Sequence, residues 1–143
     1  MEHTKANFKA LRETVGMSQA HFAKVFGINP RSVRRWENPD EVSCNPREEA
    51  WAILEEARKA QIKALDAAME AIDRIEEERG TPKTVQLTYW SSAIAYAAAH
   101  PEEDPANWQM ANANARLTAH MLEEMGYKVE FGFPGLNAVT EAE

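Results

Sequence analysis

The segment at residues 29–38, NPRSVRRWEN, carries three arginines, Arg31, Arg34 and Arg35. On a helix that turns about 100° per residue, the three arginines share one face, and the apolar pair Val33 and Trp36 shares the opposite face. A guanidinium group offers a planar set of N–H donors that fits phosphate oxygens and the edge of guanine. The same charges are also tolerated at little cost on a surface that faces only water. The arginine pattern by itself therefore leaves both interpretations open.

The charge of the chain is divided unequally along its length. The formal net charge of the whole chain is −7 at pH 7. Residues 1–37 nevertheless hold seven Lys or Arg and three Glu, a net charge of +4, whereas the remaining residues have a net charge of −11. Local charge sets the electrostatic field that a ligand meets. A basic first quarter is therefore compatible with a surface that binds phosphate.

Helix start and stop signals predict three short helices within residues 1–45. The segment ANFKALRETVG has apolar residues at helical spacing and ends at Gly16. Ser18 is a suitable N-cap for a second helix, QAHFAKVF, which Gly27 ends. Asn29 followed by Pro30 then begins the helix that carries the arginines.

The segment SQAHFAKVFGINPRSVRRWE resembles the helix-turn-helix of the Cro and phage-repressor family, also called the XRE family. The matching positions include a small residue where two helices cross, a glycine in the turn and apolar residues that close a core, namely Ala23, Gly27, Phe22, Ile28, Val33 and Trp36. In this family the second of the two helices enters the major groove of DNA, and the start of the preceding helix contacts phosphate. The resemblance implies a DNA-binding domain at residues 1–45.

The resemblance also implies roles for individual side chains. Arg31 and Arg35 would read bases through O6 and N7 of guanine, and Arg34 would contact a base or a phosphate. The DNA backbone contacts that it implies are Ser18, Gln19, Ser32 and Asn38, and we expect a further phosphate contact from Lys24. Asn29 has two candidate roles, the N-cap of its helix and a base contact. Pro30 departs from the family pattern, because a base-reading side chain often stands there and proline cannot donate a hydrogen bond to a base.

One structural interaction follows from the same resemblance. Arg12 and Glu37 would form a partly buried ion pair that ties the first helix to the end of the arginine-bearing helix. The alternative is two unconnected surface charges.

A long helix is predicted for residues 46–79, with Asn45 as its N-cap and Pro46 at its first position. At about 1.5 Å per residue, such a helix is roughly 50 Å long. A 45-residue domain cannot bury the whole apolar stripe of this helix, so its second half is expected to pack on the C-terminal part or on another chain. Gly80 and Pro82 then break the helix, which places a domain boundary at 79–84.

Residues 84–133 are predicted to form a β-α-α-β domain. Apolar residues alternate in TVQLTYW and in YKVEFGF, which is typical of strands, and two helical segments lie between them. Because two strands are marginally stable alone, we expect two copies of the chain to join their strands into one sheet. The predicted dimer interface comprises Val85, Leu87, Tyr89, Val129 and Phe131. The predicted fold class is mainly α with a small α+β C-terminal part, followed by a loose tail at 134–143.

The order of elements in the C-terminal half, with Trp108 in the middle, resembles that of the anti-CRISPR-associated autoregulators of phages and mobile elements and of related small bacterial regulators. Members of that group act as dimers that repress their own operon, and some also bind the transcript. The resemblance implies a homodimeric repressor of an inverted-repeat operator, whose partner is double-stranded DNA. Two alternatives stay open: an antitoxin whose acidic C-terminal half binds a toxin, and an autoregulator that binds both DNA and RNA.

No spacing in the sequence indicates catalysis or metal binding. The histidines His3, His21, His100 and His120 are scattered, and Cys44 has no ligand or base at a useful spacing. His21 is expected on the solvent side of its helix. We therefore expect no enzyme activity, metal or cofactor. The longest apolar run, AIAYAAA, is far shorter than the roughly 20 residues that span a bilayer. With one cysteine and no secretion-signal pattern, the chain is expected to be cytoplasmic, with no membrane partner.

Overall fold

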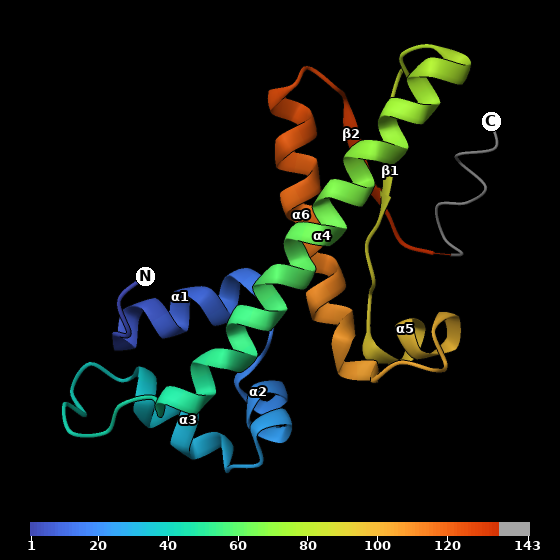
Figure 1. Cartoon of the computed structure of the whole chain (residues 1–143). Coiled ribbons are helices and arrows are strands. Elements are labelled where there is room, and N and C mark those ends of the chain that lie inside the picture. Colours follow the sequence, from blue (N-terminus) through green and yellow to red (C-terminus); the bar gives the residue numbers. More distant parts are fainter. Residues whose placement is uncertain (135–143) are drawn as a thin grey trace. The chain divides into compact units, whose positions relative to one another are not determined.

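The computed structural model describes residues 1–134 (Figure 1). The chain divides into two compact units, Met1–Gln61 and Ile62–Glu143, which we call the N-terminal unit and the C-terminal unit. The described residues are mainly helical, with a small two-stranded sheet in the C-terminal unit, as the predicted fold class requires. The division between the units lies inside the long helix α4 (Glu48–Arg79), whereas the sequence suggested a boundary at 79–84.

Three short helices precede α4 in the N-terminal unit, namely α1 (Lys5–Val15), α2 (Gln19–Phe26) and α3 (Pro30–Glu37). Each helix begins at a polar cap, because a side-chain oxygen of Thr4, Ser18 or Asn29 accepts a backbone N–H from the first turn. Gly27 ends α2 with a φ of 81°, a left-handed conformation that favours glycine. The turn between α2 and α3 is therefore short and well defined.

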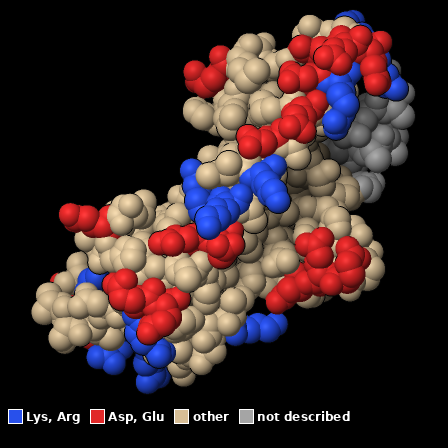
Figure 2. Space-filling model, viewed as in Figure 1, with Lys and Arg blue, Asp and Glu red and all other residues tan. Residues whose placement is uncertain are grey.

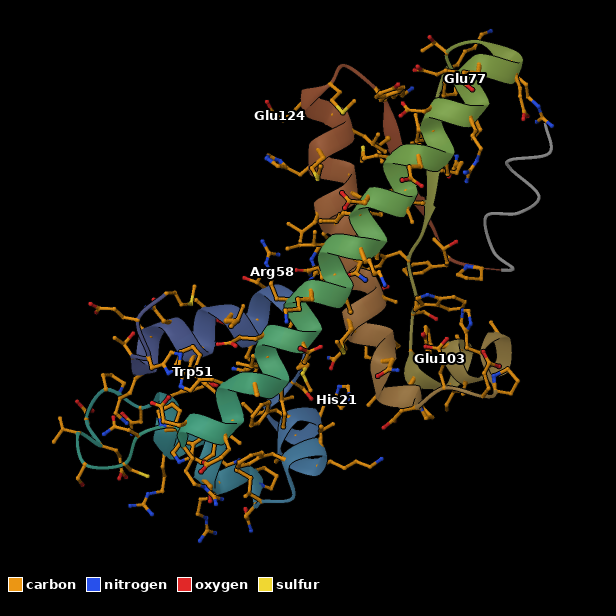
Figure 3. The ribbon with its side chains drawn as sticks, viewed as in Figure 1. His21, Trp51, Arg58, Glu77, Glu103 and Glu124 are labelled. Carbon is orange, nitrogen blue, oxygen red and sulfur yellow. The ribbon has the colours of Figure 1, made fainter. Side chains whose placement is uncertain are left out.

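Aromatic rings fill the centre of the N-terminal unit. The Phe8 ring meets the rings of Phe22, Trp36 and Trp51 edge-on, with centroid distances of 5.2, 5.8 and 5.3 Å. Trp51 comes from the first half of α4 (Figure 3). Such pairs contribute about 0.5–1.5 kcal/mol each beyond the burial of their surface. The other buried apolar residues of this core are Val15, Met17, Ala23, Val33, Ala50 and Leu54.

Helix α4 begins at Glu48, two residues later than predicted. The predicted cap residue Asn45 thus lies before the start of the helix, and its side-chain amide donates to the carbonyl oxygen of Val42 (3.3 Å). Glu48 and Glu49 occupy the first turn, where acidic side chains interact favourably with the helix dipole.

The apolar stripe of α4 is interrupted at Gln61, which is buried. The Gln61 amide donates to the carbonyl oxygen of Thr14 in α1 (2.8 Å) and accepts a hydrogen bond from the guanidinium of Arg58 (Figure 3). Both bonds lie within the N-terminal unit. The polar interruption in the sequence is therefore a structural link between α4 and the end of α1.

The C-terminal unit contains the second half of α4 and then β1 (Val85–Thr88), α5 (Ala93–Ala99), a 3-10 turn (Pro105–Asn107), α6 (Trp108–Glu124) and β2 (Val129–Gly132). The order of strands and helices after α4 is the predicted β-α-α-β. The strands pair in parallel, with Val85 opposite Val129 and Leu87 opposite Phe131. A parallel pair needs a long crossover connection, which α5 and α6 supply.

A small core holds the C-terminal unit together. Ile72, Val85 and Leu122 are buried, and four half-buried residues pack against them, namely Met69, Leu87, Tyr127 and Val129. Val85 is only 7% exposed. The structure therefore corrects one part of the predicted dimer interface, because the Val85 side chain packs inside its own chain and has almost no surface left for a partner.

No helix within residues 1–134 is long and apolar enough to cross a membrane. The tail predicted for residues 134–143 lies, from residue 135 on, outside the described residues.

Candidate nucleic-acid interface

Helix α3 presents its three arginines on one exposed face. Arg31, Arg34 and Arg35 are exposed, whereas Val33 and Trp36 on the opposite face are buried. Figure 2 shows Lys and Arg side chains gathered at the end of the N-terminal unit that α3 occupies in Figure 1. The helical-wheel prediction for this segment is confirmed: one face of α3 is fixed in a core and the other is basic and accessible.

Arg12 and Glu37 fix the end of α3 to α1. The Nε atom of Arg12 lies 2.6 Å from Oε2 of Glu37, and Nη2 lies 2.7 Å from Oε1. The Arg12 Nη1 atom also donates to the carbonyl oxygen of Met17 (2.8 Å). Gln19 donates to Oε1 of Glu37 as well, over 3.0 Å. Glu37 thus accepts three hydrogen bonds from α1 and α2, two of them from the guanidinium of Arg12.

Lys5 anchors the other side of the same helix end. Its Nζ atom donates to the carbonyl oxygens of Arg35 (3.0 Å), Trp36 (3.1 Å) and Cys44. A positive charge beside the last carbonyls of a helix is favourable, because these groups carry the negative end of the helix dipole. In the sequence, Lys5 counted only toward the basic charge of residues 1–37, and no local pattern indicated this role.

Arg35 is the one arginine of the exposed face that has an acidic partner within residues 1–134. Its Nε and Nη2 atoms lie 3.2 and 3.1 Å from Oε2 of Glu41, a residue in the loop between α3 and α4. This hydrogen bond and the charge of Glu41 raise the pKa of Arg35 above its ordinary value. Glu41 was not among the residues that the sequence singled out, since its sequence neighbours gave no sign of the contact.

Three of the side chains predicted to contact the DNA backbone already form hydrogen bonds within the N-terminal unit. The Ser18 hydroxyl caps α2 by accepting the His21 N–H (2.9 Å), and the Gln19 amide is bonded to Glu37. The Oδ1 atom of Asn38 accepts the backbone N–H of Asp40 (3.0 Å). The other two predicted contacts are Ser32, which is half-buried, and Lys24, which is exposed. Ser18 and Asn38 accept in these bonds and keep their donors, and the Gln19 amide uses only one of its two donors, so a phosphate contact is compatible with the geometry.

Asn29 acts as the cap of α3. Its Oδ1 atom accepts the backbone N–H of Arg31 over 2.8 Å, which uses one of the two lone pairs of that oxygen. The side-chain NH₂ group of Asn29 still has its donors.

Arg47 is a further cation that the sequence analysis missed. Its guanidinium carbon lies 5.0 Å from the centroid of the Phe26 ring and 5.9 Å from that of Trp36. These are cation–π distances, and Arg47 remains exposed. Pro46 and the acidic residues after position 47 indicate a helix start, and no spacing in the sequence indicates this contact.

A second group of ionisable side chains lies in the C-terminal unit, after α5. The Nδ1 atom of His100 lies 3.4 Å from a carboxylate oxygen of Glu103 and 3.9 Å from one of Glu102. Within residues 1–134, these three residues form the only cluster of three or more possible ligands whose ligand atoms lie close enough together to share a metal ion. Glu103 (Figure 3) also accepts a hydrogen bond from the Tyr96 hydroxyl (2.7 Å). Burial and the Glu103 carboxylate raise the pKa of Tyr96 to about 12. Hydrogen bonding and ion pairing around the buried Tyr96 account for this arrangement.

Comparisons with known proteins assign no family to the chain. No protein-family model matches it, and no curated protein matches it either. The assignment of a function consequently depends on the side chains of α3 and on what holds them.

Proposed function

We propose that the chain is a sequence-specific DNA-binding transcriptional repressor, which acts as a homodimer on an inverted-repeat operator. The observation that supports this most is the division of α3 into two faces. Val33, Trp36 and Glu37 hold the helix in the core, and Arg31, Arg34 and Arg35 are exposed on the other side. A helix that is fixed by one face and basic on the other suits the major groove of DNA, which is wide enough to admit it.

The spacing of Arg31 and Arg35 also suits base reading. Four residues of helix rise about 6 Å, and bases two steps apart along the duplex are separated by roughly 7 Å. Each guanidinium can donate two hydrogen bonds to O6 and N7 of a guanine. In this proposal Arg34 contacts a base or a phosphate. The DNA backbone is contacted by Lys24, Ser18, Gln19, Ser32 and Asn38.

The homodimer is proposed because one α3 helix reaches one half-site only. Two copies related by a two-fold axis would place two recognition helices about 34 Å apart, one turn of the duplex. Within residues 1–134, β1 and β2 pair only with each other, so each strand has one edge without a strand partner. Open strand edges readily pair with another chain. The regulated gene is proposed to be the protein's own operon, as in the anti-CRISPR-associated autoregulators that the chain resembles.

The test is a selection of random duplexes by the purified full chain, followed by binding measurements on the selected and scrambled duplexes at fixed salt. We expect enrichment of an inverted repeat. Arg31→Ala should weaken binding to the selected duplex by about 1–3 kcal/mol and relax the preference at one base pair. Lys59→Ala is the matched control, because it removes one exposed cation of α4 outside the proposed interface. Absence of any enriched sequence would refute the proposal.

A further inference from the structure

We propose that Glu41 is a positioning residue for base recognition: its carboxylate orients Arg35 so that the outer edge of the guanidinium faces the DNA and selects guanine. This inference rests on the proposed function. It assigns to an acidic loop residue, outside the helix-turn-helix segment, a part in specificity at one base pair.

The geometry of the ion pair leaves the base-reading edge of Arg35 available. Oε2 of Glu41 accepts from Nε (3.2 Å) and from Nη2 (3.1 Å), which occupies the inner edge of the guanidinium. A guanidinium has five N–H donors, and the outer edge formed by Nη1 and Nη2 keeps two parallel donors. Two parallel donors match O6 and N7 of guanine. Glu41 and a guanine can therefore bind Arg35 at the same time, on different edges.

The loop holds Glu41 in place independently of Arg35. The backbone N–H of Glu41 donates to the carbonyl oxygen of Asn38 (3.1 Å), and the Glu41 carbonyl accepts the N–H of Cys44 (3.0 Å). The N–H of Asp40 donates to the Asn38 side chain (3.0 Å), and Lys5 bonds the carbonyl oxygen of Cys44. This loop follows α3 directly (Figure 1). The carboxylate that contacts Arg35 is thus fixed from the backbone side by several hydrogen bonds.

The stability of the fold does not explain this ion pair. The side chains of Arg35 and Glu41 are 54% and 36% exposed, and ion pairs this accessible contribute little to folding. The ion pair instead favours DNA binding, because an arginine that is already ordered loses less conformational entropy when it contacts a base. Arg31 and Arg34 have no such carboxylate partner within residues 1–134.

Positioning and simple electrostatics predict opposite effects of removing Glu41. A carboxylate near DNA repels phosphate, so the loss of its charge alone should strengthen binding to every duplex equally. The loss of a positioning group should instead weaken the preference for one base pair. The two explanations are separated by measuring preference and affinity together.

The experiment compares the full-length wild-type chain with Glu41→Gln and Asp40→Asn. The base pair read by Arg35 is first located as the position at which Arg35→Ala removes the preference in the selected duplex. Dissociation constants are then measured for four duplexes that differ only there, and for a random duplex. Glu41→Gln should reduce the preference for guanine at this position by roughly threefold to tenfold and leave preferences elsewhere unchanged. Asp40→Asn makes the same charge change beside it and should leave all preferences unchanged.

Three results would overturn the assignment. The first is a Glu41→Gln chain that binds all duplexes more tightly with its guanine preference intact, and the second is an equal effect of Asp40→Asn. The third is an effect of Glu41→Gln that persists in the Arg35→Ala background. A wild-type chain that prefers no duplex over another would refute the proposed function itself, and the positioning role with it. Thermal unfolding of Glu41→Gln with the same midpoint temperature as the wild-type chain verifies that the fold is intact.

Discussion

Arg12 and Glu37 form a two-point ion pair whose side chains are 8% and 3% exposed. Removing one partner leaves the other charge buried without compensation, which typically costs about 3–5 kcal/mol. We therefore expect Arg12→Ala and Glu37→Ala each to lower the free energy of unfolding by about this amount. Urea denaturation of the full chain, followed by the fluorescence of Trp36 and Trp51 among the tryptophans, measures the loss.

A double-mutant cycle gives the control for this prediction. Because each single variant leaves one uncompensated charge, Arg12→Met combined with Glu37→Leu should be far less destabilised than the sum of the single variants. The pair Glu56 and Lys59 is exposed on α4, so Lys59→Ala should cost less than about 1 kcal/mol. Additive losses at Arg12 and Glu37 would mean that the ion pair is not coupled in solution.

Substitution of the exposed arginines of α3 should weaken DNA binding and leave the stability of the fold almost unchanged. Arg31→Ala and Arg35→Ala remove side chains outside the core, so the unfolding free energy should change by no more than about 0.5 kcal/mol. Binding to the selected duplex should weaken by about 1–3 kcal/mol, with relaxed specificity at one base pair for each variant. Lys24→Ala should instead weaken binding to all duplexes alike. Equal losses on selected and random duplexes for both arginine variants would contradict their roles as base readers.

The helices of the N-terminal unit could be predicted because their signals are local. A cap residue and apolar residues at helical spacing determine α1, α2 and α3 within a few neighbouring positions, and a glycine ends α1 and α2. The exposure of the arginines follows from the same periodicity. The start of α4 was misplaced by two residues: the helix begins at Glu48, and the Asn45 side chain bonds Val42 in the preceding loop.

Contacts between different elements account for most of what the sequence could not predict. Lys5, Glu41 and Gln61 each act through a partner on another element, and no spacing pattern in the chain indicates such partners. The parallel pairing of β1 with β2 likewise depends on the path of the chain between them. His21, expected on the solvent side of α2, is buried, since the start of that helix packs into the N-terminal unit.

Tyr96 should make the C-terminal unit sensitive to alkaline pH. Its pKa in the folded chain is about 12, above the ordinary value of 10.0, first because the hydroxyl is buried and then because Glu103 accepts its hydrogen bond. Folding therefore favours the protonated form. The stabilisation is fully present below about pH 10 and is lost as the pH rises toward 12.

Tyr96→Phe tests this directly. The variant should lack the tyrosine that ionises near pH 12 in an ultraviolet titration, and its unfolding free energy should fall less between pH 10 and 12 than that of the wild-type chain. Tyr89→Phe is the control, because it removes a tyrosine hydroxyl that is bonded to Arg116 and not to a carboxylate. An identical pH dependence of the wild-type chain and Tyr96→Phe would contradict the prediction.

Val85 and Phe131 should respond differently to truncation, although the sequence placed both in one dimer interface. Val85 packs against Ile72 and Leu122, so Val85→Ala should cost roughly 2 kcal/mol of folding stability through lost burial and a cavity. Phe131 is 45% exposed and meets the Tyr89 ring edge-on at 5.3 Å. Phe131→Ser should therefore change the stability of a single chain much less.

Phe131 should contribute to the association between two chains. If the edge of β2 pairs with a second copy, Phe131→Ser should weaken the dimer in sedimentation at micromolar concentration while the fold of each chain persists. Ile94→Ser is the matched control, since Ile94 is an exposed apolar residue of α5 in the same unit, away from both strands. An unchanged dimer in Phe131→Ser would move the interface away from this strand, and a wild-type chain that sediments as a monomer would contradict the dimer. In that case a single α3 would contact one half-site, and the selected duplexes should lose their inverted symmetry because no second recognition helix is held in register.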